Sequence, residues 1–227
     1  MATEPPKPKR KRHWFRFSLK TLVLVLTVFG IWLGLLVHRV NKQKEAVQWV
    51  KDHGGWVRYD YEWEREKKSP IEDAEPPGPD WLRELIGIDY FTDVTLVGFH
   101  NATVEDIEPL GNLTQLQWLI LTDTQVSDIT PLRELTQLHV LYLIGTQVTD
   151  LDPLRELTQL QQIYLNRTQV SDITPLRDLT QLQLLYLYST QVSDLSPLTG
   201  MKSVTIFLDE NQQVTIPEEL KDRVVRD

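Results

Sequence analysis

An aspartate recurs every 22 residues along the C-terminal part of the chain. The five members of this column are Asp106, Asp128, Asp150, Asp172 and Asp194. A row of carboxylates on stacked repeats could hold calcium ions, because calcium prefers oxygen ligands. However, each repeat supplies one carboxylate, and no second acidic column accompanies it. We therefore expect each aspartate to accept hydrogen bonds from backbone amides of its own turn rather than to bind metal.

The residue types on which catalysis most often depends are absent or isolated. The chain contains no cysteine, which excludes disulfides, thiolate zinc sites and cysteine nucleophiles. His100 and His139 lack a second ligand at metal-binding spacing, and no G-x-S-x-G, phosphate-binding loop or H-E-x-x-H pattern occurs. We therefore predict no catalytic site, no metal and no cofactor, and we expect that the protein is not an enzyme.

The aspartates belong to a 22-residue repeat that begins at Phe91. Five units cover residues 91–112, 113–134, 135–156, 157–178 and 179–200, and a degenerate sixth extends to residue 220. Apolar residues occupy unit positions 1, 4, 7, 9, 14, 17 and 20, and the alternation at 7 and 9 predicts one short β-strand per unit. Position 18 precedes a proline in all five units, which predicts an N-cap and a short helix or 3₁₀ turn. The position-18 residues are Glu108, Thr130, Asp152, Thr174 and Ser196.

Units such as ITPLRELTQLHVLYLIGTQVTD closely resemble the repeats of bacterial proteins of the internalin type, over about residues 91–220. The resemblance implies an α/β fold, a leucine-rich-repeat solenoid used for protein recognition. Its parallel sheet would form the concave face, and short helices or 3₁₀ turns the convex face. The family usually has asparagine at unit position 12, where this chain has Ala102 and then four threonines. Threonine hydroxyls can donate to a neighbouring carbonyl, but Ala102 cannot, so we expect a looser first turn.

The solvent-facing side of the predicted sheet is rich in apolar and aromatic residues. If positions 7 and 9 point into the core, positions 6, 8 and 10 point outward, and Tyr142, Tyr164 and Tyr186 should form a row of neighbouring rings. A contiguous apolar patch with Trp and Tyr is typical of an interaction surface. The alternative is that β-propensity and ring packing alone select these residues. The predicted partner-binding residues are Trp118, Ile120, Val140, Tyr142, Ile144, Tyr164, Asn166, Arg167, Leu184, Tyr186 and Tyr188.

The N-terminal part carries a predicted membrane anchor. Residues 1–16 form a basic tail, and residues 17–38 are long and apolar enough for one transmembrane helix. A cleaved signal peptide would need a small-x-small site, which the residues after the apolar run lack, and a buried soluble helix would not be apolar all round. More Lys and Arg precede this segment than follow it, which favours a cytoplasmic tail and extracytoplasmic repeats. Gly30 and Gly34 could let two such helices pair, or could be ordinary transmembrane glycines.

The segments that flank the repeats are predicted from their composition. Residues 39–79 should contain a helix over 42–53, a short strand and a charged, proline-rich linker. Residues 80–90 should form a short helix whose apolar face caps the first repeat, and residues 221–227 a polar tail. The apolar face of that helix consists of Trp81, Leu82, Leu85 and Ile86.

The acidic body of the chain narrows the choice of partners. Residues 45–227 contain 31 Asp and Glu against 14 Lys and Arg, which argues against nucleic-acid binding. The sequence therefore predicts a membrane-anchored module that binds a protein or peptide on the concave face of its repeats. The alternative is a structural anchor that self-associates through the transmembrane helix and the repeat face.

Overall fold

The computed structural model describes residues 19–64, 69–71 and 74–226. The chain divides into two compact units, Met1–His38 and Arg39–Asp227. The predicted basic tail at 1–16 and the first two residues of the predicted span at 17–38 lie outside the described residues.

The described part of the first unit consists of the N-terminal turns of helix α1 (Leu19–Asp52). Its large apolar side chains, from Leu19 to Leu35, are exposed. Among the described residues, α1 is the one helix that is long and apolar enough to cross a membrane. The predicted helix over 42–53 is not separate but continues this helix, because the sequence between 38 and 42 contains no glycine or proline.

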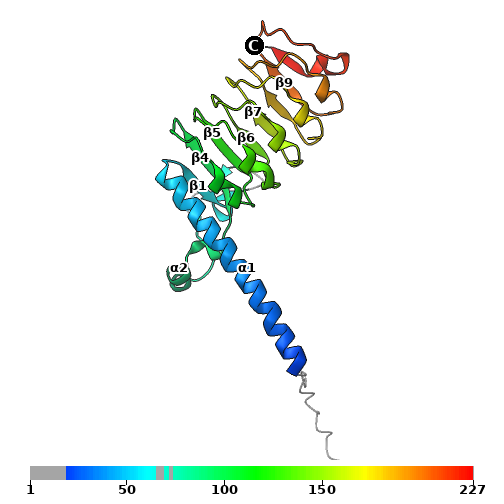
Figure 1. Cartoon of the computed structure of the whole chain (residues 1–227). Coiled ribbons are helices and arrows are strands. Elements are labelled where there is room, and N and C mark those ends of the chain that lie inside the picture. Colours follow the sequence, from blue (N-terminus) through cyan, green and yellow to red (C-terminus); the bar gives the residue numbers. More distant parts are fainter. Residues whose placement is uncertain (1–18, 65–68, 72–73, 227) are drawn as a thin grey trace, which may run out of the picture. The chain divides into compact units, whose positions relative to one another are not determined.

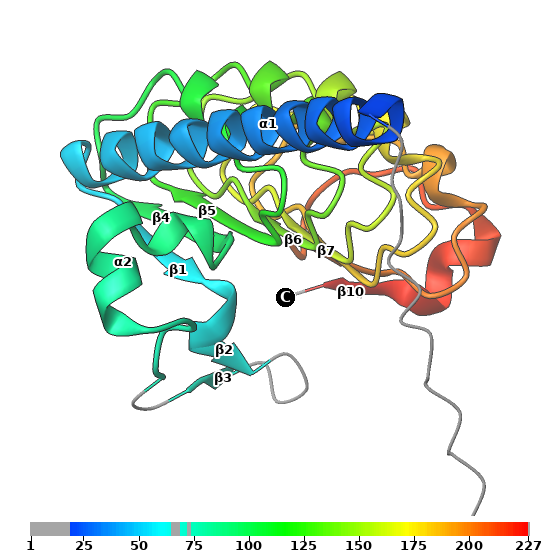
Figure 2. The same ribbon diagram turned by 90° about the horizontal axis from the view of Figure 1, so that it is seen from below.

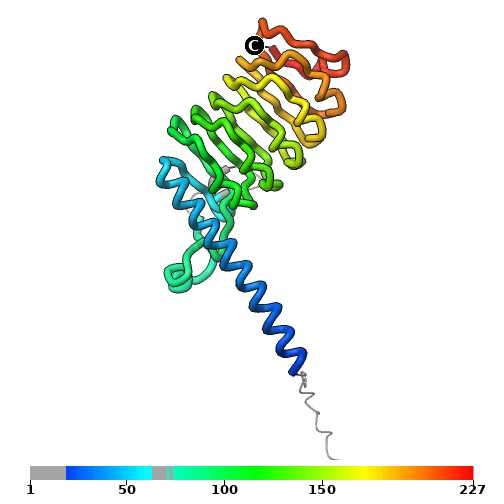
Figure 3. The backbone as a smooth tube through the Cα atoms, in the orientation of Figure 1, coloured from blue at the N-terminus to red at the C-terminus, as the bar shows by residue number. Residues whose placement is uncertain are grey.

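The second unit is a solenoid in which each repeat adds one strand to an eight-stranded sheet, in the order β1-β4-β5-β6-β7-β8-β9-β10. Strands β4 to β9 pair in parallel. Their bounds are β4 Val94–His100, β5 Trp118–Thr122, β6 Val140–Tyr142, β7 Gln162–Tyr164, β8 Leu184–Tyr186 and β9 Thr205–Leu208. The strands follow one another along the stack (Figure 1) and the backbone winds in successive coils (Figure 3). The predicted parallel sheet is confirmed.

The repeated leucines and valines form a single core inside the coils. The position-4 column is representative, since Leu116, Leu138, Leu160 and Leu182 are all fully buried. Burial of one such side chain contributes about 1.5–3 kcal/mol relative to exposure. Because each leucine packs against its equivalents in the adjacent repeats, the core is continuous from the first repeat to the last.

A 3₁₀ turn follows each strand of the first five repeats, as predicted. The turns are η3 Glu108–Asn112, η4 Thr130–Glu134, η5 Asp152–Leu154, η6 Thr174–Leu176 and η7 Ser196–Leu198. Each turn has a proline in its first two positions, where the missing amide is harmless. The predicted N-cap is wrong in one detail. The cap residue is the apolar one at position 17, and it makes no side-chain cap bond.

The C-terminal part of α1 closes the first end of the solenoid. Ala46, Val47 and Val50 belong to the hydrophobic core, and the Trp49 ring meets Phe99 edge-on at 5.7 Å. The helix ends at Asp52, just before Gly54 and Gly55 as predicted. A Cβ atom on Gly55 would lie 2.5 Å from the Phe99 ring, so only glycine allows the chain to turn this close to the core.

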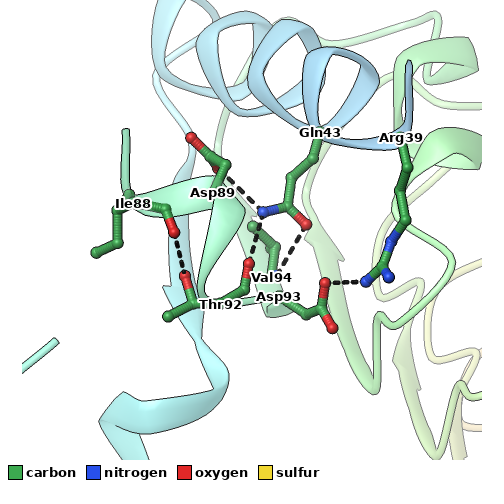
Figure 4. A network of polar contacts seen from close by, with 7 residues as sticks. All are labelled: Arg39, Gln43, Ile88, Asp89, Thr92, Asp93 and Val94. Carbon is green, nitrogen blue, oxygen red and sulfur yellow. Dashed lines mark hydrogen bonds and ion pairs between the residues drawn. The ribbon is translucent and has the colours of Figure 1, made fainter. Parts of the chain in front are cut away.

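Polar contacts fix the same helix to the start of β4 (Figure 4). The buried Gln43 amide donates to the Asp89 carboxylate and to the Thr92 carbonyl, both at 3.0 Å, and its oxygen accepts from the Val94 amide at 3.4 Å. One turn earlier, Arg39 pairs with Asp93. Gln43 thus satisfies backbone groups at the exposed end of the stack, where no preceding repeat exists to do so.

Residues 80–90, which were expected to cap the first repeat, do not cover the core. Helix α2 (Asp80–Ile86) has no buried residue, and 3₁₀ turn η2 (Ile88–Tyr90) links it to β4. The cap is instead formed by α1 and by β1 (Trp56–Tyr59), which pairs antiparallel with β4. The C-terminal turns of α1 bury Val40, Ala46, Val47 and Val50, whereas none of the seven residues of α2 is buried. Strand β1 continues into η1 (Asp60–Glu62), and β2 (Trp63–Glu64) pairs with β3 (Ser69–Pro70) (Figure 2).

The predicted polar tail at 221–227 is also corrected. Residues Val224–Arg226 form β10, the last strand of the sheet, after the 3₁₀ turn η8 (Glu218–Arg223). The Arg226 guanidinium donates to the carbonyls of Asp209, Glu210 and Gln212 at 3.0–3.3 Å. These contacts satisfy carbonyls of the last described coil.

Candidate functional site

Three tyrosines stack on the outward side of adjacent strands, as predicted. Tyr142, Tyr164 and Tyr186 are register partners on β6, β7 and β8. The ring centroids of Tyr142 and Tyr164 are 4.0 Å apart with planes 5° from parallel, and those of Tyr164 and Tyr186 are 4.5 Å apart at 9°. The strand spacing of about 4.8 Å permits this face-to-face packing because the side chains occupy the same position of consecutive repeats.

The stack is part of a longer row that crosses the whole sheet. We define the concave row as the outward side chains in register with these tyrosines. It consists of Trp56, Ile120, Tyr142, Tyr164, Tyr186, Phe207 and Val225. Phe207 stacks on Tyr186 at 4.2 Å and 3°, and Val225 is the register partner of Phe207 on β10. At the other end, the Trp56 indole fills the space above Gly98, where a Cβ atom would lie 2.4 Å from the ring.

Sequence reasoning missed the three outer members of the concave row. Phe207 follows Tyr186 by 21 residues rather than 22, because the sixth unit is one residue shorter at this point. Trp56 and Val225 lie outside the repeats altogether. The glycine at position 8 of the first unit was the available signal, because a missing side chain on a half-buried face often marks the close approach of another group.

Stacking determines which part of each ring is available to a partner. The rings of Tyr142, Tyr164 and Tyr186 are half-buried, because each aromatic face lies against its neighbour. Burial and the neighbouring Tyr142 hydroxyl raise the pKa of Tyr164 well above its ordinary value, so Tyr164 stays neutral. The ends are more open, with Trp56 43% exposed and Val225 37% exposed. The row therefore offers ring edges and hydroxyls at its centre and apolar groups at its ends.

The remaining predicted residues flank the concave row, with one exception. Trp118, Ile144, Leu184 and Tyr188 are half-buried beside it. Asn166 is also half-buried, and its Oδ1 atom accepts no hydrogen bond from the described residues. Val140 is corrected, because it is only 3% exposed and cannot serve as a contact residue. Its short side chain lies between the longer side chains of its register partners Trp118 and Gln162.

Arg167 lies at the edge of the face, in a turn that sequence reasoning overlooked. Position 11 has a positive φ in five consecutive units, at Asn101, Asp123, Gly145, Arg167 and Ser189. Arg167 pairs with Asp123, two repeats away, at 2.9 Å. The pair passes over Gly145, where a Cβ atom would lie 2.2 Å from the Asp123 carboxylate. The mixture of Asn, Asp and Gly in this column was a signal for left-handed backbone.

The aspartate column makes the local bonds that the sequence predicted. Each Oδ1 accepts the amide hydrogen of the residue two positions later, at 2.8–2.9 Å, in all five repeats. Hydrogen bonds from the side chains and backbone amides of Thr130, Thr174 and Ser196 lower the pKa of Asp128, Asp172 and Asp194. The column therefore has a structural role in starting the 3₁₀ turns.

The threonine column at position 12 also matches its predicted role. The hydroxyls of Thr124, Thr146, Thr168 and Thr190 donate to the carbonyl three residues earlier at 2.6–2.9 Å. The Asp and Thr columns are thus engaged in hydrogen bonds within their own repeats, whereas the side chains of the concave row mainly contact one another. The concave row is accordingly the better candidate for a binding surface.

Comparisons with known proteins agree with this fold. The family model described as leucine-rich repeats in two copies matches residues 114–156 and 136–178. Internalin C2 from Listeria monocytogenes is similar at 32% identity and a TM-score of 0.51, over 55% of this chain and 57% of that one. The leucine-rich-repeat ectodomain of the receptor kinase SOBIR1 from Arabidopsis thaliana has a TM-score of 0.52 at 14% identity, over 74% of this chain and 91% of that one, and so shows the fold alone. A search of curated proteins finds no match.

The chain thus has a leucine-rich-repeat solenoid fold with an apolar N-terminal helix, and its repeats are similar to those of Listeria internalins. It spans little more than half the length of the internalin that it resembles. Folds of this class typically serve as binding scaffolds without enzymatic activity, and they generally mediate protein–protein interactions.

Proposed function

We propose that the protein is a membrane-anchored interaction module that binds a protein or peptide through the concave row. The observation that carries this proposal is the continuity of the row, which places apolar or aromatic groups in register on seven of the eight strands and over the eighth. Trp and Tyr dominate the binding energy of protein interfaces, because they bury a large area at a low entropic cost. Trp118, Ile144, Leu184 and Tyr188 extend the contact area beside the row.

The anchoring part of the proposal is supported by the exposed apolar surface of α1. Leu24, Val25 and Leu26 point in three different directions, about 100° apart around the helix, and all three are exposed. A helix that is apolar on every side is stable only where lipid or protein surrounds it. The basic residues before the apolar run favour a cytoplasmic N-terminus and extracytoplasmic repeats.

The binding proposal is tested by cross-linking in native membranes. We would replace Tyr164 with the photoreactive analogue p-benzoylphenylalanine, which retains an aromatic ring in the stack. The matched control carries the same group at Arg155, a solvent-exposed residue on the convex face. We expect a specific adduct from position 164, and its loss when Tyr142 and Tyr186 are both changed to Ser. Equal adducts from both positions, or none from 164, would refute the proposal.

The topology is tested separately with single cysteines, because the chain has none of its own. A cysteine at the exposed position Gln147 should react with an impermeant maleimide on intact cells. A cysteine at Ala2 should react only after permeabilisation. The reverse pattern would place the repeats in the cytoplasm.

A second candidate function, self-association through the membrane helix, is supported by the two glycines on α1. A Cβ atom built on Gly30 or Gly34 has no neighbour within 4 Å, so both positions are open to a second helix. Cross-linking yields in mixed bilayers would distinguish the candidates. A lower yield of cross-linked dimer from Gly30→Leu than from the original chain would support self-association. Finding only monomer with both chains would exclude it.

A further inference from the structure

Helix α2 displays two large apolar side chains that no part of the described protein covers. Trp81 is 66% exposed and Leu85 is 72% exposed. They are the most exposed large apolar residues of the second unit. Because they are four residues apart, they lie on one stripe of the helix, while Leu82 and Ile86 are half-buried. The side of α2 that carries Trp81 and Leu85 therefore has no partner among the described residues.

The exposed pair belongs to a helix that is held in place at both ends. The Lys44 ammonium donates to the Ile86 carbonyl at 2.8 Å and lies 5.0 Å from the centre of the Tyr90 ring. Gly87 permits this approach, since a Cβ atom there would lie 2.8 Å from the Lys44 nitrogen. At the other end, Arg83 donates to the carbonyls of Pro76 and Gly78. The exposure of Trp81 and Leu85 is therefore a property of an ordered element.

The attachment point of α2 lies close to the apolar run of α1 along the chain. Lys44 follows Val37, the last apolar residue of that run, by seven residues of continuous helix. At about 1.5 Å per residue this separation is roughly 10 Å of helix. The headgroup layer on each side of a bilayer is about 5–8 Å thick, as the difference between its total and hydrocarbon thickness indicates. Along the chain, the attachment point of α2 thus follows the proposed membrane span by only a few residues.

We propose that Trp81 and Leu85 insert into the interfacial layer of the bilayer that α1 crosses, so that α2 is a second, peripheral membrane contact. This inference rests on the proposed anchoring by α1. Tryptophan is enriched at this depth, where its ring is apolar and its N–H can still meet water. The contact would hold the N-terminal end of the solenoid against the lipid surface and limit the directions in which the concave row can face.

The charges on α2 indicate which feature of the lipid is recognised. Asp80 and Glu84 are exposed on the stripe beside the apolar pair, whereas Arg83 is engaged by carbonyls and by Asp80. The free Glu84 carboxylate would be repelled by anionic headgroups, and Asp80, which is already paired with Arg83, would not attract them. The contact is therefore apolar insertion at the headgroup boundary, and it should not require anionic lipid.

The test uses the full chain with single spin-labelled cysteines, in nanodiscs of phosphatidylcholine that hold one copy each. Labels at Leu85 and at its neighbour Glu84 are compared with a label at Gln169, an exposed residue of the fourth repeat. For each label we would measure collision rates with oxygen, which concentrates in lipid, and with a water-soluble nickel complex. We expect the logarithm of the oxygen-to-nickel ratio to be positive at 85 and negative at 169, with 84 between them. Changing Trp81 to Ser should shift position 85 toward water.

A label at Leu26 separates the two levels of the proposal. If the label at 26 lies in the bilayer but the label at 85 is as accessible to nickel as that at 169, the anchor stands and the α2 contact is overturned. If the label at 26 is itself in water, the proposed anchoring fails. Protection at 85 that appears only with two copies per nanodisc would also overturn the lipid contact, because it would identify a second protein copy as the occupant.

Discussion

The regular repeats and the N-terminal end of the solenoid solve the same problem in different ways. In the repeats, the recurring polar groups find their partners at fixed positions, as with the buried Thr146 hydroxyl and the Leu143 carbonyl or the exposed Asp150 carboxylate and the Asp152 amide. At the N-terminal end the contacts occur once, as with the Gln43 amide and the Arg39–Asp93 pair. Internal repeats can therefore reuse the same contacts, whereas the end of the stack needs contacts of its own from a flanking segment.

The largest effects should come from truncating the core, and they should differ between the two regions. Leu143→Ala removes a fully buried side chain between two repeats and should lower the free energy of unfolding by about 2–5 kcal/mol. Val50→Ala at the cap removes less volume and should cost about 2 kcal/mol. Denaturant titration of the detergent-solubilised chain gives both values. Hydrogen exchange should show that the Val50 variant loses protection first in β4, and uniform loss along the stack would contradict a separately stabilised cap.

Removing a polar contact should cost more at the end than inside the stack. Gln43→Leu leaves the Val94 amide and the Thr92 carbonyl without this partner and should destabilise the fold by about 1–3 kcal/mol. Thr146→Val removes a single hydroxyl and should cost about 1 kcal/mol. The measurement is the shift of the urea midpoint at an unchanged slope. A larger shift for Thr146→Val than for Gln43→Leu would reverse the comparison.

The close approach at Gly98 provides an intermediate test at the border of the two regions. Gly98→Ala places a Cβ atom against the Trp56 ring and should displace it, at a cost of about 1–3 kcal/mol. The matched change in the repeats is Gly145→Ala, which disturbs the Asp123–Arg167 pair and a left-handed turn, at about 1–2 kcal/mol. Cross-linking from Tyr164 should then weaken only in the Gly98 variant, because that variant disrupts the concave row. An equal loss of cross-linking in both variants would show that binding does not depend on the concave row.

The smallest expected effects concern the dependence of stability on pH. Stability should rise with pH in the acid range and fall with pH in the alkaline range. The pKa values of Asp128, Asp172 and Asp194 are lowered by hydrogen bonds to the charged form, so their contribution is present above the ordinary value of 3.8 and is lost as pH falls through the lowered pKa. Asn at all three positions should therefore reduce the acid dependence of the melting temperature. An unchanged acid limb would exclude these carboxylates as its cause.

The tyrosines act at the alkaline end. Burial raises the pKa of Tyr164 in the repeats, and burial with the nearby Asp89 raises that of Tyr59 at the N-terminal end. Because the unfolded chain releases these protons first, their stabilising contribution is complete below pH 10 and decreases as pH rises toward the raised pKa. Tyr164→Phe and Tyr59→Phe should each flatten the alkaline limb of a pH–stability profile. A steeper limb in either variant would contradict this assignment.

The sequence by itself determined the repeat, the strand and turn in each unit, the tyrosine stack and the local roles of the Asp and Thr columns. These features depend on contacts between residues that are close in sequence or separated by one period, and a 22-residue pattern encodes both. The membrane anchor followed from composition, and it stays a prediction.

Only the tertiary structure decided how the stack ends and how far the concave row extends. Trp56 fills the place of the missing side chain at Gly98, Val225 completes the row on β10, and α1 rather than α2 covers the open core. No period relates these residues to the repeats, so no column predicts them. They are brought together because an open end of a stack exposes apolar core and unpaired backbone groups, and whichever flanking segment satisfies both most completely becomes the cap.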